Sequence, residues 1–279
     1  MSSRRRMALV PTILTLACAS LIASEAEAQP RSDTGVTDPN GHPFRMPTVS
    51  PLESVYRIGA IHVSRGDRSE WVALGDFGDR WSFWILERPE ERFELSGSFH
   101  LKAASRFELE SLDNLFVEIT FRVGGYVRAR YGRMALRVEA YHESSHLGDE
   151  FLVENPRELI STSREGFDFL FQVAPVSGLI VFGGPGFIVR SALPFEKVSF
   201  RAGSEWELES ERWARPYVGV DAFMWSELDW TPQITAEAGV ALGRNARLGV
   251  HLGTGPSRAG QFFREDETLI GLLFSYRRS

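Results

Sequence analysis

Residues 117–123 are Val-Glu-Ile-Thr-Phe-Arg-Val, so apolar and polar side chains alternate at every position. Successive side chains of a β-strand point to opposite faces, and this period of two predicts a strand with one apolar and one polar face. The same alternation recurs at residues 95–103, 198–202, 218–224 and 248–252. The chain is therefore predicted to be all-β.

Such strands fit two architectures. In a soluble sandwich the apolar face packs into a core, whereas in a transmembrane barrel it meets lipid and the polar face lines the interior. The predicted strands run to about ten to fifteen residues, against about five or six in globular proteins, which favours the barrel. Aromatic residues such as Trp81, Trp84 and Trp213 gather near predicted strand ends, as interfacial girdles do. A periplasmic β-sandwich is the alternative.

An antiparallel up-and-down barrel of twelve strands is expected. Ten strands is the alternative, because the run Gly75–Asp79 interrupts the first part of the pattern. The expected strands are 68–76, 80–87, 92–108, 114–130, 133–147, 165–175, 179–192, 197–208, 214–226, 229–242, 245–256 and 264–277. An even number places both termini at the periplasmic end, together with tight turns near 131–133, 177–178 and 243–245.

The amino terminus predicts export. Residues 1–28 combine Arg4–Arg6, an apolar stretch at 8–23 and the small-residue site Ala26-Glu27-Ala28, as secretory signal peptides do. A lipoprotein signal ending at Cys18 is less favoured, because bulky Leu16 precedes it where a small residue is needed.

Beyond the signal peptide, residues 29–54 are rich in Pro, Ser, Thr and Asp and are predicted to form an extended periplasmic leader. Residues 55–279 are then the barrel, and the predicted location is the bacterial outer membrane. Removing residues 1–28 would also remove the only cysteine, so no disulfide is expected.

The charge balance narrows the possible partners. The chain has 31 basic and 37 acidic side chains, a net charge of -6, which argues against nucleic-acid binding. No phosphate loop, zinc signature or nucleotide fingerprint is present, so neither a cofactor nor a metal is expected.

The densest polar run is residues 141–150, Tyr-His-Glu-Ser-Ser-His-Leu-Gly-Asp-Glu. The even-numbered residues of Met134–Ala140 are apolar and mark the lipid side, so His142, Ser144 and His146 are predicted to continue the outward row. His142 and Ser144 are two residues apart on one face, which makes a nucleophile-and-base pair at the height of the lipid head groups.

Two other interpretations of this run stay open. It could fold as a hydrogen-bonded cap, with Asp149 and Glu150 accepting bonds from loop N–H groups and Gly148 supplying a turn. A metal site of His142, His146, Asp149 and Glu150 is less favoured, because four residues along a strand separate the two imidazoles by about 13 Å.

Many inward positions are charged, and they favour a salt-bridged network that fills a narrow lumen. The alternative is a narrow substrate-selective channel. His100 and His251 are expected to belong to the network, whose other members are Glu118, Arg122, Arg128, Arg130, Arg137, Glu139, Arg201, Glu205, Asp221, Glu237 and Arg247.

The run at 141–150, together with Gly-Pro-Ser-Arg-Ala-Gly-Gln-Phe at 255–262, closely resembles the bacterial family catalogued as domain of unknown function twelve-oh-seven. This resemblance implies an outer-membrane barrel without an established activity. The alternating face of residues 268–276 resembles the terminal strand that the barrel-assembly machinery recognises, so that machinery is the expected partner during biogenesis.

A weaker resemblance is to outer-membrane phospholipase A and lipid A deacylase, whose lipid-facing His-x-Ser pair is similar to His142-Glu143-Ser144. It implies a surface lipid-ester hydrolase, with outer-membrane lipids and lipopolysaccharide as partners and with Ser144, His142 or His146, and Glu165 as catalytic residues. Glu165 is expected near His146 if strands 133–147 and 165–175 pair. Asn155 is the second choice for the third catalytic group, and a monomer is expected.

Overall fold

The computed structural model describes residues 47–53, 55–110, 115–155, 162–210 and 212–277. The predicted signal peptide and most of the predicted leader, residues 1–46, lie outside this range. Among the described residues, no helix is long and apolar enough to cross a membrane.

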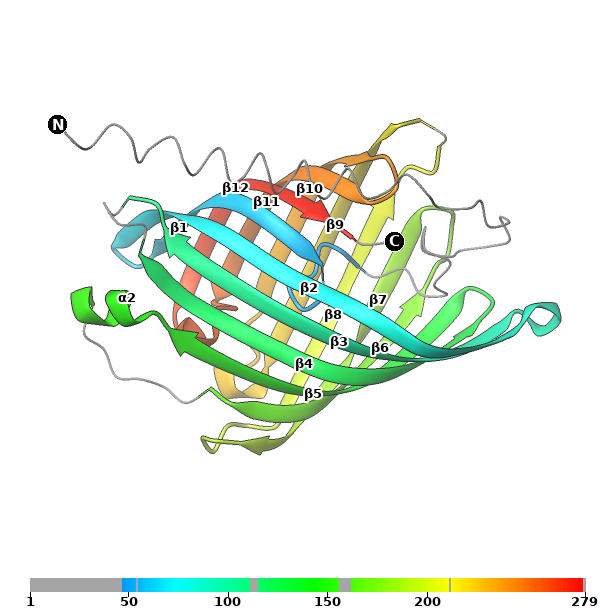
Figure 1. The fold of residues 1–279 in the computed structure, drawn as a ribbon, viewed down its shortest axis with the longest axis horizontal. Coiled ribbons are helices and arrows are strands. Elements are labelled where there is room, and N and C mark those ends of the chain that lie inside the picture. The colour runs from blue at the N-terminus through cyan, green and yellow to red at the C-terminus, as the bar shows by residue number, and fades with distance from the viewer. Residues whose placement is uncertain (1–46, 54, 111–114, 156–161, 211, 278–279) are drawn as a thin grey trace. The chain divides into compact units, whose positions relative to one another are not determined.

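Within the described ranges, twelve antiparallel strands form one closed barrel, in which each strand pairs with its sequence neighbours and β1 pairs with β12 (Figure 1). The strands are β1 Tyr56–Arg65, β2 Arg68–Arg88, β3 Phe93–Glu108, β4 Phe116–Tyr131, β5 Met134–Leu147, β6 Arg164–Val173, β7 Leu179–Ser191, β8 Val198–Glu207, β9 Ala214–Trp225, β10 Gln233–Leu242, β11 Ala246–Pro256 and β12 Asp266–Tyr276. The described connections contain one short helix, α2 Asp149–Glu154, and the 3-10 turns η1 Pro89–Glu91, η2 Ser226–Leu228 and η3 Gly260–Phe262. The prediction of a twelve-strand up-and-down barrel is confirmed, and the sandwich and the ten-strand barrel are excluded.

The barrel has two distinct ends. At the terminal end, Tyr56 of β1 pairs with Tyr276 of β12. The loop end carries the β5–β6 connection with α2, which lies at the left of Figure 1. The tight turns predicted around Gly132, Gly178 and Gly243 all lie at the terminal end, and each glycine has a positive φ, between 57° and 75°, that side chains rarely tolerate.

Ten predicted strands match the structure to within four residues at each end, but the prediction for the first two strands is wrong. Residues 68–76 and 80–87 belong to one long strand, β2, because Gly75–Asp79 pairs with β3 without a break. The actual first strand, β1, was missed since its Ile61 and Val63 point inward, where they pack in a small apolar cluster with Leu273. The apolar-outward rule therefore does not hold for β1.

Elsewhere the two faces differ as the alternation predicts. On β5, Met134 and Leu136 are exposed, whereas Arg137 and Glu139 are buried in the lumen. Outward apolar side chains such as Leu272 are exposed around the barrel, which is the arrangement expected of a surface that contacts lipid.

The aromatic prediction holds only in part. Trp81, Trp84 and Trp213 are exposed. Trp225, the last residue of β9, is instead buried, and Tyr126, which lies within β4 and not at its end, is buried too. Trp225 packs edge-on against Phe195, with ring centroids 5.2 Å apart. Aromatic residues near strand ends therefore serve both faces of this barrel.

The charged lumen is confirmed. Every inward residue named above is buried except Arg130, which is half-buried. His100 lies 3.0 Å from Glu139, and His251 lies 3.1 Å from Glu237, so both histidines belong to the network as expected. Paired charges make burial tolerable, because an isolated ion in a low-dielectric interior carries a large desolvation cost.

Residues 47–53, here called the lumen finger, occupy the same interior. Within the predicted extended leader, these residues instead form turns, in which the N–H of Ser50 donates to the Pro47 carbonyl at 3.2 Å and that of Glu53 donates to Ser50 at 3.3 Å. Val49 is fully buried and packs in a cluster with Ile180 and Phe182.

The finger is held by strands on several sides of the barrel. Glu53 accepts hydrogen bonds from Arg137 of β5, at 2.7 and 2.9 Å, and from Arg201 of β8, at 2.8 Å. The hydroxyl of Thr48 donates to Glu205 at 3.0 Å. Burial alone would raise the pKa of Glu53, but the guanidinium groups of Arg137 and Arg201 outweigh it and hold that pKa well below its usual range. The finger thus spans the lumen, which argues against an open channel.

Candidate active site on the outward face

Strand β5 carries the predicted outward row. His142 and Ser144 are half-buried and His146 is exposed, while Glu143 and Ser145 between them are buried in the lumen. The side to which each of these residues points was therefore predicted correctly. The regular β4–β5 pairing, without a bulge, carries this alternation to the end of the strand.

Strand β6 supplies the acid. Glu165 pairs in register with His142, and its Oε1 lies 3.6 Å from Nδ1 of the imidazole. Both side chains are a little over 40% exposed, at 44% for His142 and 42% for Glu165. Glu165 was expected near His146, so that detail is wrong by four positions along β5. In the structure the acid lies beside His142 and not beside His146.

One further residue, on β7, contacts the pair of His142 and Glu165. Arg190 lies with Nη1 3.7 Å from Oε1 of Glu165. Sequence reasoning missed Arg190 because the β6–β7 register shifts between Glu165 and Gly166. A bulge of this kind changes which residues share a face, and the alternation of β7 alone does not reveal it.

His146 has a different environment from His142. Its ring lies 6.4 Å from the ring of Phe121 on β4, and Phe121 is also the residue directly opposite Ser144. Among the described residues, no carboxylate pairs with His146. The structure therefore separates the two histidines that the sequence left as alternatives.

Ser144 lies beside His142 on the same face but does not yet bond to it. Residues two apart on a strand are roughly 6.6 Å apart along the chain, and the described structure contains no hydrogen bond between these two side chains. Catalytic hydrogen bonds are often long before substrate binds, so the spacing is compatible with a nucleophile and its base.

Asn155, the second choice for the third group, lies elsewhere. It ends helix α2, where its Nδ2 donates to the Phe151 carbonyl at 3.4 Å and its Oδ1 accepts from Arg68 at 3.4 Å. These contacts tie Asn155 to its own helix and to the first residue of β2. The structure does not bring it to His142.

The run 141–150 also differs from the predicted loop cap. Residues up to Leu147 continue β5, and Asp149 and Glu150 begin helix α2 with no side-chain cap at its start. Among the described residues, no three His, Cys, Asp or Glu side chains gather in a group that could hold a metal ion.

The inward side chains of β5 are held by several ion pairs. Arg122 of β4 donates to Glu139 at 2.8 and 3.0 Å and to Glu143 at 3.2 Å, and it also pairs with Asp168. Its guanidinium lies 3.6 Å from the ring centre of Tyr141. Consecutive residues of β5 therefore alternate between a partly exposed histidine–serine row and a buried ion-pair network.

A closed strand barrel with a charged lumen and an apolar outer surface defines this protein as an outer-membrane-type β-barrel. Residues 36–278 match the family described as Protein of unknown function (DUF1207), and the chain belongs to this family. The family resemblance inferred from the sequence is thereby confirmed. No curated protein matches the chain.

Solved structures show where this fold occurs. The chain is similar to outer membrane phospholipase A from Escherichia coli, with 12% identity and a TM-score of 0.59 over 84% of this chain and 93% of that one. It is equally similar to the Salmonella typhi outer membrane phospholipase, described as a dimer with bound calcium, with 12% identity and a TM-score of 0.59 over 81% and 91% of the chains. A third match is an Escherichia coli phospholipase with an active-site asparagine replaced by alanine, with a TM-score of 0.58 at 12% identity over 84% and 93% of the chains. At such identity the likeness concerns the fold alone.

Proposed function

We propose that this protein is a lipid-ester hydrolase that acts at the surface of the outer membrane. The nucleophile is Ser144, the general base is His142, and Glu165 orients the imidazole. The observation that carries the proposal is the register pairing of His142 with Glu165, which puts a carboxylate 3.6 Å from Nδ1 beside an outward serine.

The chemistry follows from that arrangement. Because Nδ1 of His142 faces Glu165, Nε2 is the nitrogen free to take the proton of Ser144. The serine oxygen attacks the acyl carbonyl, and collapse of the tetrahedral intermediate expels the alcohol of the lipid, which takes the proton from His142. Water then attacks the acyl-serine with His142 again as base, releases the fatty acid and restores the serine.

The surroundings support a membrane lipid as substrate. The outward row of β5 continues from His142 towards the terminal end through Val138, Leu136 and Met134, which would lie against acyl chains. An acyl ester near the head groups would then lie at the height of Ser144. His146 packs beside Phe121 and has no proton-transfer role in this proposal.

Orientation and assembly complete the proposal. The terminal end faces the periplasm and the loop end faces outward, so the substrate is an acyl ester of a phospholipid or of lipopolysaccharide. The signal peptide is removed after residue 28, the barrel-assembly machinery inserts the chain, and the barrel works as a monomer. Recovery in the outer-membrane fraction and heat-modifiable migration in detergent gels test the location.

The activity test uses the purified barrel in mixed micelles with phospholipid and, separately, with lipopolysaccharide. The expected result is fatty-acid release by the wild type and none by Ser144→Ala. Ser145→Ala is the matched control, because this neighbouring serine is buried in the lumen and bonds to Glu118 at 3.3 Å. Equal release by wild type and Ser144→Ala, or no release from either lipid, would contradict the proposal.

A further inference from the structure

The lumen contains a cavity of about 130 Å³ on the opposite face of the strands from Ser144. Pro51 and Leu52 of the lumen finger line part of it, so the finger lies against the cavity inside the barrel. For scale, an engineered protein cavity of about 150 Å³ holds one benzene molecule. The cavity therefore has the size of a ligand with a single ring.

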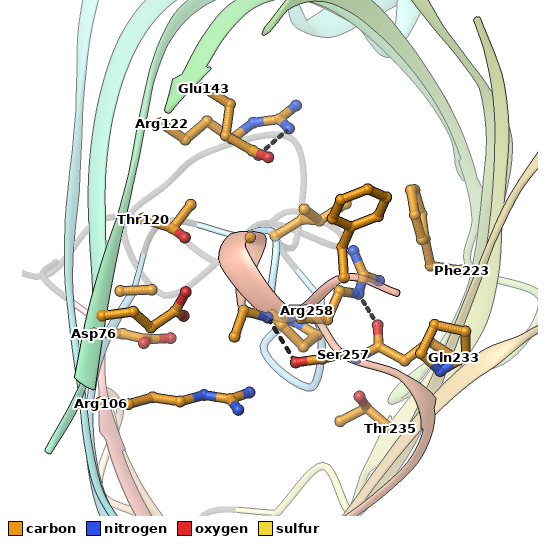
Figure 2. Close-up of a pocket in the computed structure, with 18 of the residues that line it drawn as sticks. Asp76, Arg106, Thr120, Arg122, Glu143, Phe223, Gln233, Thr235, Ser257 and Arg258 are labelled. Atoms are coloured by element: carbon orange, nitrogen blue, oxygen red, sulfur yellow. Dashed lines mark hydrogen bonds and ion pairs between the residues drawn. The ribbon is translucent and has the colours of Figure 1, made fainter. Parts of the chain in front are cut away.

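The charged lining of this cavity is mostly basic. Three carboxylates, of Asp76, Glu118 and Glu143, are part of the lining. The basic residues of the lining are Arg57, Lys102, Arg106, Arg122, Arg164 and Arg258. Figure 2 shows Arg106 and Arg122 extending inward from one wall and Arg258 lying between that wall and Phe223. Arg122 pairs with Glu143 inside the lining at 3.2 Å. The carboxylates that pair with Arg106 and Arg258, namely Glu267 and Asp221, are outside the lining.

Hydrogen-bonding capacity in the lining is also unbalanced. Four buried groups on lining residues have no partner in the described structure: Nε of Arg57, Nε of Arg164 and the hydroxyls of Thr120 and Thr162. The two arginine N–H groups can only donate and the two hydroxyls can donate as well as accept, whereas none of the buried carboxylate oxygens of the lining lacks a partner. Since an unsatisfied buried donor is unfavourable, such a lining favours a ligand rich in acceptors.

The opposite wall is aromatic, and two arginines stack on it. The guanidinium carbon of Arg258 lies 4.1 Å from the ring centre of Phe223, and that of Arg164 lies 4.9 Å from the ring centre of Trp225. Phe195 and Phe263 extend the same wall, with ring centroids 5.3 Å apart. An apolar ring and an anion would thus find complementary groups within one small cavity.

Arg258 is only partly compensated by its neighbours. It lies in the β11–β12 connection, where Nη2 is 3.3 Å from Asp221 and Nε donates to Gln233. Burial lowers the pKa of Arg258 to about 10, and the carboxylate of Asp221 offsets this only in part. The guanidinium stays charged at neutral pH, so a second anion beside it would be stabilising.

We propose that this cavity is a binding site for a small aromatic carboxylate, with the ring against Phe223 and Trp225 and the carboxylate between Arg258 and Arg164. The site lies inside the barrel and does not depend on the proposed hydrolysis at Ser144. The mixed character of the lining, basic on one side and aromatic on the other, carries the assignment.

Calorimetric titration of the purified barrel in detergent tests the ligand class, with benzoate as probe and micelles alone as blank. Benzyl alcohol keeps the ring without the charge, and acetate keeps the charge without the ring. Benzoate is expected to bind with a Kd below about 1 mM and at least about tenfold more tightly than either control. Equal affinity for benzoate and benzyl alcohol, or no heat from benzoate, would overturn the proposal.

Variants test the position of the site. Arg258→Gln is expected to weaken benzoate binding about tenfold, because the substitution removes a charge-assisted contact with the carboxylate. Arg264→Gln, in the same connection but exposed and paired with Glu227, is the matched control and should bind like the wild type. If Arg258→Gln fails to fold, as judged by heat-modifiable migration, Phe223→Leu replaces it with the same expectation. Unchanged affinity in either folded variant contradicts the assignment.

Discussion

The two faces of β5 differ in how firmly their side chains are held. On the outward face, His142 and Glu165 are partly exposed and 3.6 Å apart. On the inward face, Glu139 and Glu143 are buried and bonded to Arg122 at 2.8 to 3.2 Å. One strand can thus contribute stability through one face and present adjustable side chains on the other, because alternation separates the two roles.

The largest effect is expected on the outward face. His142→Ala should lower lipid hydrolysis by about 10⁴-fold or more, since loss of the base leaves Ser144 protonated. Fatty-acid release from mixed micelles measures this effect. His146→Ala, from the same row but beside Phe121, should leave the rate unchanged. If the two variants lose activity equally, the assigned base is wrong.

The inward face should respond through stability instead. Arg122→Met leaves the carboxylates of Glu139, Glu143 and Asp168 less compensated, and it should reduce the free energy of unfolding by about 3–5 kcal/mol. Denaturant unfolding of the barrel in lipid vesicles measures the change. Hydrolysis per folded molecule should stay at the wild-type level.

A matched control for that experiment is Arg88→Met. Arg88 is exposed and pairs with Glu91 at 3.4 Å, so its loss should cost less than about 1 kcal/mol. Equal destabilisation by the two substitutions would show that burial does not distinguish them.

The lumen finger adds a pH dependence to the inward side. Glu53→Gln should reduce the free energy of unfolding by about 3 kcal/mol at neutral pH. The folded-state pKa of Glu53 is depressed, so its contribution is complete above the unfolded-state pKa of about 4.3 and is lost as the pH falls towards the folded-state value. The difference between wild type and variant should therefore shrink on acidification. A difference that grows at low pH would contradict the finger contacts.

Among the residues with an assigned role, the smallest effect is expected for the orienting acid. Glu165→Gln should lower hydrolysis by about 10- to 100-fold, because the neutral amide keeps the shape of the side chain but no longer stabilises the charged form of the imidazole. Partial exposure of the pair moderates the loss, since solvent screens the interaction. Initial rates at saturating lipid measure it, and Glu150→Gln on α2 serves as the control. A rate equal to that of the wild type would show that Glu165 does not orient His142.

Much of this contrast could be predicted from alternation alone. The outward direction of Ser144 and the inward direction of Arg137 both follow from a period of two, which survives wherever a strand pairs without a bulge. Strand β1 could not be found in this way, because Ile61 and Val63 face a local apolar patch inside the lumen. The register of β6 against β5 depends on the β5–β6 connection, whose geometry the alternation does not encode.

The lumen finger was beyond sequence reasoning for a different reason. Pro, Ser and Thr in residues 47–53 suggest an extended segment, and Glu53 has no oppositely charged neighbour that would mark it as buried. Its partners Arg137 and Arg201 are 84 and 148 positions away, and only barrel closure brings them together. Ion pairs between residues so far apart in the sequence can be recognised only once the three-dimensional topology is known.

The most direct test of the central claim is covalent labelling of the folded barrel with a fluorophosphonate that reacts with activated serines, followed by mass spectrometry of the peptides. The proposed site predicts an adduct on Ser144 that is absent in His142→Ala, while the inward neighbour Ser145 stays unmodified. No adduct on Ser144, or an adduct that persists undiminished in His142→Ala, would contradict the assignment of the outward face of β5 as an active site.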